Sequence, residues 1–305
     1  MKKSFLTLVL LSFVCAIAVA EPAQSDKQTS DSKTTGNSVR NYLEIAGQGG
    51  VSSFVGNPHQ GYFAPGYNAG LGFYYILRSL PYHIGMRTGL AAESSQSVYK
   101  ISDYSDTYLT VDAAGDPLEV NYNIGNINET HTQFYFTIPI QFSVFGKNLA
   151  FHVGPKLSVT LTDFSSQDLY SVQLGCYYPN SGKRVDNDAN LSAGFQPQQT
   201  LSVKHDKILP KIWLSAAAEL TYDVNITKNY CITFGLYADY AINQYTVNKT
   251  TNPSLLYLTK MSDDSNVLIR KSDSALRGNY NGDQLVEKFG YFSAGFKVAF
   301  KVWGY

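Results

Sequence analysis

The chain has 305 residues, of which 16% are charged and 14% are aromatic, and its formal net charge at pH 7 is zero. This balance leaves no basic surplus for binding nucleic acid, so we expect no nucleic-acid partner. The 23 Tyr, 17 Phe and 24 Gly are typical of a chain rich in strands and in membrane-interface aromatic residues, rather than of a helical protein. Composition therefore favours an all-β class.

Residues 1–20 have the features of a secretory signal peptide. Two N-terminal lysines precede an apolar run that closes in a small-residue motif ending at Ala20, after which we expect cleavage. Cys15 leaves a lipoprotein alternative open, although Val14 stands where the lipoprotein motif favours a small residue. Since no other apolar run approaches about 18 residues, we expect no helical membrane span in the mature chain.

The next segment, residues 21–40, is polar and lacks hydrophobic periodicity. Such a segment cannot bury enough apolar surface to order itself, so we interpret it as a flexible periplasmic leader. A partner-binding role for this leader is the alternative.

A hairpin predicted from His131 to Asp163 is the clearest structural signal in the chain. Apolar and polar residues alternate with a period of two on both sides of a short turn at 145–148, as expected of two amphipathic strands. Each strand spans about 13 residues, whereas strands of globular sheets have about 5–6 and strands that cross a bilayer need about 9–11. The length of this hairpin therefore suits a membrane.

The same alternation predicts eight strands. They cover Asn41–Phe54, Gly66–Leu77, Tyr82–Glu93, His131–Val144, Leu149–Thr162, Lys211–Val224, Tyr230–Tyr245 and Phe289–Trp303. The connections after the second, fourth and sixth strands are short, at Arg78–Pro81, Phe145–Asn148 and Asn225–Asn229. The connections after the third, fifth and seventh strands are long, at Ser94–Thr130, Asp163–Pro210 and Thr246–Lys288.

An even number of strands with short and long connections in alternation is the pattern of an outer-membrane barrel. We therefore predict an all-β fold over residues 41–305, an eight-stranded antiparallel up-and-down transmembrane β-barrel in the bacterial outer membrane. Its short turns should face the periplasm, and its long loops 94–130, 163–210 and 246–288 should face outside. The alternative is a soluble lipocalin-like barrel with its apolar face inside, which the long strands and the one-sided long connections disfavour.

Charged residues of both signs share the polar face of the predicted strands. They are Glu44, Arg87, Glu93, Lys156, Glu219, Asp239, Lys297 and Lys301. Because an eight-stranded barrel is only wide enough for side chains to fill it, these residues should form a packed network of ion pairs in the lumen. Glu219 lies in the middle of its strand and needs a cation, for which Arg87 and Lys297 are the candidates.

Two short motifs carry a resemblance to a known family. The run Phe136-Thr137-Ile138-Pro139-Ile140, followed by Val153-Gly154-Pro155, resembles the PorT-like outer-membrane barrels of Bacteroidetes, which are similar to OmpA-like eight-stranded barrels. The resemblance covers residues 41–305 and implies no catalytic residues. Independently of it, each proline lacks a donor for the ladder and predicts a local break in pairing. Tyr305 departs from the common ending of outer-membrane barrels because it has the inner parity of its strand.

A search for catalytic or metal-binding motifs finds no strong candidate. The segment 186–190 has the spacing of an EF-hand opening but lacks the glycine and the glutamate that the loop requires, so we interpret it as a solvated acidic loop. No histidine or cysteine pair has metal-ligand spacing. We therefore expect no metal, no cofactor and no enzyme. A membrane acyltransferase or lipase built around His131 or His205 is the enzymatic alternative.

The long predicted loops carry the tyrosines that we interpret as contact residues. They are Tyr99, Tyr104, Tyr108, Tyr170, Tyr177, Tyr178, Tyr257 and Tyr280. Exposed tyrosines among Ser, Asn and Asp suit contacts with a partner. The leading hypothesis is therefore a non-enzymatic outer-membrane protein, structural or adhesive, that binds through its outer loops. The alternative is a narrow pore or a subunit of a transport or secretion complex.

The partners expected from this hypothesis are the lipid of the outer membrane, the machinery that inserts barrels into it, and an extracellular ligand or a partner in a membrane complex. The sequence does not identify that ligand.

Overall fold

The computed structural model describes residues 39–79, 83–112, 114–186, 201–206, 208–227, 229–248, 250–252, 254–260, 268–280 and 282–303. The expected signal peptide, nearly all of the expected leader and Tyr305 lie outside these ranges. Within the described ranges the chain forms strands, turns and bends, and no helix there is long and apolar enough to cross a membrane.

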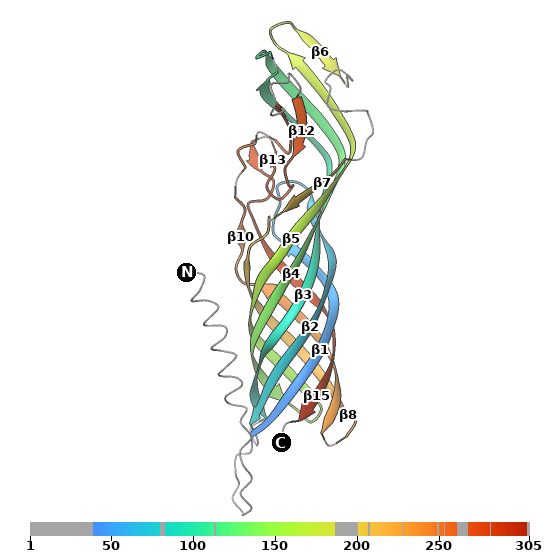
Figure 1. The fold of residues 1–305 in the computed structure, drawn as a ribbon, viewed down its shortest axis with the longest axis vertical. Helices are drawn as coiled ribbons and strands as arrows, with labels where there is room; N and C mark the ends of the chain where they lie inside the picture. The colour runs from blue at the N-terminus through green and yellow to red at the C-terminus, as the bar shows by residue number, and fades with distance from the viewer. Residues whose placement is uncertain are drawn as a thin grey trace, which may run out of the picture.

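Eight long antiparallel strands form a closed barrel (Figure 1). They are β1 (Val39–Val55), β2 (Tyr62–Ser79), β3 (Ile84–Val111), β4 (Pro117–Phe145), β5 (Leu149–Tyr178), β8 (Ile212–Asn225), β9 (Tyr230–Ala241) and β15 (Lys288–Trp303). Neighbours in this order pair with each other, and β1 pairs with β15 to close the ring. The predicted all-β, eight-stranded, up-and-down barrel is therefore confirmed.

The outer surface of the barrel is apolar. Large side chains there remain exposed, among them Phe136, Ile140, Leu220, Phe296 and Val298. The inner surface holds buried polar and charged side chains, including Arg87 at 0% exposure. An apolar exterior around a charged interior suits a barrel in lipid, where each strand must also satisfy its backbone groups within a closed ring. This arrangement is the inverse of a lipocalin, so that alternative is wrong.

The first predicted proline coincides with an interruption in the sheet. Between β4 and β5 the ladder passes from the pair Pro139–Lys156 directly to Phe142–Val153. On the other side of β4, the ladder with β3 is also interrupted, between Ala91–Thr137 and Thr88–Ile140. Pro139 lacks the N–H that would continue the ladder, which accounts for the gap.

Two of the predicted long loops are mostly strand, which corrects the predicted ends of three strands. β3 continues through Val111, β4 begins at Pro117 and β5 continues to Tyr178, so that the loops 94–130 and 163–210 are largely replaced by paired strands. Two short strands, β6 (Lys183–Asp186) and β7 (Leu201–Asp206), pair with β5. We call the part of β3, β4, β5 and β6 beyond the barrel the extension; it forms the upper end of the molecule in Figure 1.

The extension was not predicted because the alternation of buried and exposed residues shifts by one position where the strands leave the barrel. On β3 the buried positions are odd through Ile101 and even from Tyr104 onward. Asp103 between them has a positive φ of 53°, and Ser171 on β5 has one of 57°. The three strands change phase side by side, since Ser102 pairs with Asn126 and Asn126 pairs with Tyr170. A search for an uninterrupted period of two ends at each of these positions.

The third predicted loop, 246–288, folds back onto the barrel. After β10 (Tyr245–Thr246), which pairs with β15, its described parts form two small hairpins. These are β11 (Leu256–Lys260) with β12 (Leu268–Ser272), and β13 (Asn279–Tyr280) with β14 (Asp283–Gln284). Leu255, Leu276 and Leu285 in this region have 0% exposure and belong to one hydrophobic cluster with Phe289 of β15. We call the described residues of 250–287 the plug.

Candidate functional site

The lumen brings together all eight of the charged residues expected there. Glu44, Arg87, Glu93, Lys156, Glu219, Asp239, Lys297 and Lys301 each have 8% exposure or less. They project from six strands, since alternate residues of each strand point inward. The interior is therefore crowded with charge rather than open.

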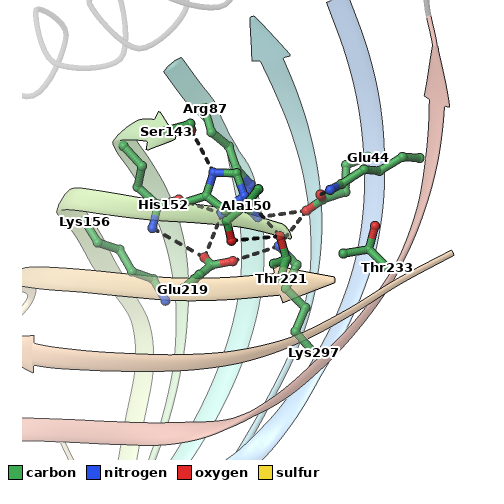
Figure 2. Close-up of polar contacts among 12 residues, drawn as sticks. Glu44, Arg87, Ser143, Ala150, His152, Lys156, Glu219, Thr221, Thr233 and Lys297 are labelled. Carbon is green, nitrogen blue, oxygen red and sulfur yellow. Dashed lines mark hydrogen bonds and ion pairs between the residues drawn. The ribbon is translucent and has the colours of Figure 1, made fainter. Parts of the chain in front are cut away.

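Arg87 and Lys297 bind the same two carboxylates (Figure 2). Arg87 donates to Glu219 at 2.7 Å and to Glu44 at 3.0 Å, while Lys297 lies 2.8 Å from Glu219 and 2.5 Å from Glu44. Arg87 also donates to the side-chain oxygen of Gln141 at 2.6 Å. Each charge is thus matched by two opposite charges, which offsets the large cost of removing it from water.

A second group of ion pairs lies further along β3. The ammonium of Lys156 is 2.9 Å from Glu93 and 2.7 Å from Asp239. Near the short turns, Lys301 lies 2.7 Å from Asp223. Asp223 is not among the residues expected in the network. Its role depends on the stagger between β8 and β15, which parity alone does not determine.

An uncharged layer above these ion pairs was also missed. The side-chain amide of Asn68 donates to the hydroxyls of Tyr135 at 3.2 Å and Tyr291 at 3.0 Å, and it accepts from Tyr237 at 2.7 Å. All four side chains are buried. A signal for this layer was present, because these tyrosines share the inner parity of their strands, and a buried tyrosine hydroxyl needs a partner.

Small residues make room for this filling at specific points. A methyl group at Gly70 would lie 2.8 Å from Cγ of Glu93, and one at Gly72 would overlap the ring of Tyr74. The Tyr74 ring in turn lies 3.7 Å from the guanidinium of Arg87, measured from ring centroid to Cζ, a cation–π contact. A cavity of ≈ 10 Å³ persists beside Lys156, which is room for about one water molecule.

Glu129 fastens the plug to the barrel. Its buried carboxylate accepts hydrogen bonds from Ser274 at 2.5 Å and from the backbone N–H of Ala275, both in the plug. From β5 it accepts bonds from Ser165 at 3.1 Å and Gln167 at 3.2 Å. Burial alone would raise the pKa of Glu129, but nearby His131 and His205 and the hydrogen bond from Ser274 outweigh burial and hold the pKa below its usual range.

The histidines named for the enzymatic alternative lie beside this carboxylate. His131 is 3.1 Å from Glu129, and it shares a row with Ser165 and His205 across three strands. Ser165 donates to Glu129 rather than to either imidazole. A nucleophile needs a base within hydrogen-bond reach, and no such pair forms in this row. Ser165 instead helps to hold the carboxylate of Glu129, which in turn binds the plug.

One serine–histidine pair does exist inside the barrel. Ser143 lies 2.7 Å from His152, and both side chains have 0% exposure. Substrate has no access there, so this pair is part of the packing. In the described part of the chain, no group of three His, Cys, Asp or Glu could hold a metal ion. Cys176 and Cys231 are both buried and form no disulfide.

The eight tyrosines expected as exposed contacts differ in their exposure to solvent. The prediction is wrong for Tyr99, Tyr104 and Tyr108, whose exposure is 0%, 0% and 6%. The change of alternation phase at Asp103 turns Tyr104 and Tyr108 inward, where they belong to the same hydrophobic cluster as the buried leucines of the plug. Three others, Tyr178, Tyr257 and Tyr280, are partly buried against the same cluster. The remaining two, Tyr170 and Tyr177, are exposed at 36% and 37%.

Comparisons with known proteins give only distant similarities. No family model and no curated protein matches the sequence. The chain is similar to the attachment invasion locus protein Ail of Yersinia pestis at 10% identity, covering 85% of this chain and 98% of that one, with a TM-score of 0.25. It is similar to Neisserial surface protein A at 9% identity, covering 85% and 96%, with a TM-score of 0.23. The third is the outer-membrane protease OmpT of Escherichia coli, at 8% identity, 89% and 99% coverage, and a TM-score of 0.30.

These comparisons do not confirm the resemblance to PorT-like barrels, and they carry no inference about activity. The chain's own architecture places it in a membrane: eight antiparallel strands close into a ring, the ring is apolar outside, and charged side chains of both signs pair inside it. The protein is therefore an integral β-barrel of the bacterial outer membrane.

Proposed function

We propose that this protein is a non-enzymatic surface-binding barrel, whose extension projects outside the cell and carries the contacts with a partner. The observation that carries the proposal is the contrast between its two ends. One end has only short turns, whereas at the other the lumen is covered by the plug and three strands continue beyond it. In outer-membrane barrels the longer connections face outside, which supports this orientation.

The lumen offers little support for transport. Two ion-pair groups and the Asn68 layer fill the barrel interior, and the Leu-rich plug covers it. A solute would have to separate buried ion pairs and displace a packed hydrophobic cluster. Both steps are costly, so the filled lumen favours binding outside the barrel over a narrow pore.

The outward face of the extension has the composition of a contact surface. Leu109 is 73% exposed and Val111 is 50% exposed, and Tyr177 of β5 is exposed as well. Leu109 pairs with Glu119, and Glu119 pairs with Tyr177, so that Leu109 and Tyr177 lie in one row across three strands. Exposed aliphatic and aromatic side chains beside polar ones are typical of surfaces that bind partners.

Adherence of intact cells tests this proposal. Bacteria that display the wild-type chain should be retained on a mucin-coated or collagen-coated surface better than bacteria that lack it. A variant with Leu109→Ser and Tyr177→Ser should lose this retention while keeping its heat-modifiable migration on gels. Phe296→Leu, a change on the lipid-facing surface, serves as the matched control. Equal retention with and without the protein on both coatings would contradict the proposal.

A mild-detergent extraction addresses the other candidate, a subunit of a transport or secretion complex. A surface-binding barrel should be extracted without a stoichiometric membrane partner. Recovery of such a partner at a fixed ratio, together with unchanged adherence of the double variant, would favour the complex instead.

A further inference from the structure

The extension contains a hollow with a volume of about 560 Å³ that lies outside the lumen network. Its lining comes from three adjacent strands, from β6 and from the plug. The residues are Ser105, Asp106, Thr107, Asn121, Tyr122, Asn123, Gln173, Leu174, Gly175, Arg184 and Tyr280. Small-molecule sites typically measure about 300–1,000 Å³, so the hollow is large enough for a ligand of two or three rings.

Paired strands fix the geometry of this lining. Ser105 pairs with Asn123, and Asn123 pairs with Gln173, which sets one row of polar residues across β3, β4 and β5. Two positions along, Thr107 pairs with Asn121, and Asn121 pairs with Gly175. Polar side chains on a paired sheet are held at fixed spacings, as a preorganised binding site requires.

Some polar groups of the lining bond to other residues of the protein, and others do not. Asp106 accepts hydrogen bonds from Tyr104 at 3.2 Å and from Ser254, so its charge is engaged within the protein. The side-chain amides of Asn123 and Gln173 bond to no other residue in the described ranges. Each amide offers two donor hydrogens and an acceptor oxygen, a combination that matches adjacent hydroxyl groups of a sugar.

One tyrosine completes this chemistry. Tyr122 and Tyr280 both line the hollow, but the Tyr122 ring is 4% exposed and packs against Tyr104 and Tyr108, so the half-buried Tyr280 supplies the ring that a ligand can reach. A flat aromatic face can pack against the C–H face of a pyranose ring, while amides bond to its hydroxyls. Amides and an aromatic ring together therefore suit a polyhydroxylated ligand better than an apolar one.

The charge of the lining distinguishes between kinds of glycan. Arg184 is the sole cation among the lining residues of the hollow, and Asp106 is an anion in the same lining. A sulfated or otherwise polyanionic glycan would need several cations to neutralise it. The lining is instead nearly neutral and rich in amides.

We propose that this hollow binds a neutral saccharide, which would make it the specific ligand site of the surface-binding function proposed above. The inference rests on that proposed function for its biological meaning, but binding itself can be measured on the purified chain.

Isothermal titration calorimetry of the refolded full-length barrel in detergent tests the inference, with maltotetraose and chitotetraose as neutral probes and dextran sulfate as the polyanionic probe. We expect saturable binding of at least one neutral probe. The pair Asn123→Ala with Gln173→Ala should weaken it about tenfold, since each lost hydrogen bond contributes a few-fold. Asn126→Ala is the matched control, because Asn126 is exposed on the same strand but does not line the hollow.

Three results would overturn the inference: no binding of either neutral probe, equal binding by wild type and the double variant, or binding of dextran sulfate alone. Adherence of cells that carry the Asn123→Ala and Gln173→Ala variant separates the saccharide site from the broader surface-binding function. If the wild-type protein promotes adherence but no neutral probe binds, the saccharide site is wrong and the surface-binding function stands. If a neutral probe binds but adherence does not depend on the protein, the site stands and the adhesive function fails.

Discussion

Glu219 shows how far a single residue can be placed from sequence. Its position inside the barrel follows from the period of two on β8, and Arg87 and Lys297 were its candidate partners because they share the inner parity. Their distances to Glu219, 2.7 and 2.8 Å, depend on the stagger of strands distant in sequence. The same stagger brings both cations to Glu44, which parity could not have predicted.

Removing the Glu219 carboxylate should therefore destabilise the barrel strongly. Glu219→Ala leaves Arg87 and Lys297 each with one carboxylate fewer in a buried site, and breaking such a pair typically costs about 3–5 kcal/mol. Ile138→Leu on the apolar face is the control and should cost below about 1.5 kcal/mol. Urea unfolding of the refolded barrel measures both. If Glu219→Ala unfolded at the same urea concentration as wild type, the lumen charges would act as independent, hydrated groups.

Glu129 predicts how acid affects the plug. Its pKa lies below the ordinary value of 4.5, so the folded state favours the charged form. The stabilisation is therefore fully present above pH 4.5 and is lost as the pH falls through the lowered pKa. Hydrogen exchange at the Ala275 amide should report this, with protection at pH 6 that declines only in stronger acid.

Glu129→Gln supplies the matching control for the acid response. The amide oxygen can still accept from Ala275, but it carries no charge, so protection should be weaker throughout and should lack an acid transition. An identical acid transition in wild type and Glu129→Gln would assign the effect to another group.

Among the elements, the barrel strands could be predicted and the extension could not. A continuous alternation identifies a strand only while the phase is kept, and β3 changes phase at Asp103 and β5 at Ser171. The surrounding residues are polar, since one face is solvated, so the apolar signal is also weaker there than in the lipid-facing part. A search that allowed one phase change per strand would have found the continuation of β3 through Tyr104 and Tyr108.

The backbone at Asp103 makes the phase change testable. Its φ of 53° is in the left-handed region, which Asp tolerates and a β-branched residue does not. Asp103→Gly should therefore leave the extension intact, whereas Asp103→Val should destabilise it locally by about 1–2 kcal/mol. Hydrogen exchange over 104–111 measures this. Faster exchange in the Gly variant than in the Val variant would show that the left-handed residue is not required.

At the scale of the whole molecule, two features block the bore of the barrel: the charged side chains in the lumen and the plug. Only the first could be predicted from the sequence. The filled lumen could be anticipated, because eight strands leave only a narrow bore and the charges have inner parity. The plug could not, because 246–288 has no strand-like alternation and its buried leucines share a hydrophobic cluster with residues far away in sequence, such as Tyr104 and Trp213. Its contacts are set by the fold of the barrel rather than by any local pattern.

Because both the lumen ion pairs and the plug block the bore, we can predict the conductance of the barrel. The wild-type monomer should form no steady nanosiemens-scale pore in planar bilayers, since the ion pairs and the plug both block the bore. A variant with 250–286 replaced by a Gly-Ser linker should also stay closed, because Arg87, Lys297 and Lys156 still fill the lumen with their carboxylates.

Single-channel recording of both proteins distinguishes the two barriers, with an open porin as the positive control for insertion. Steady conductance from the linker variant alone would make the plug the only barrier and would mean that water and ions pass between the charged side chains. Conductance from the wild type would contradict both levels of closure and restore the pore alternative. Silence from both proteins is the expected result, because each lumen cation would have to leave two carboxylates before an ion could pass.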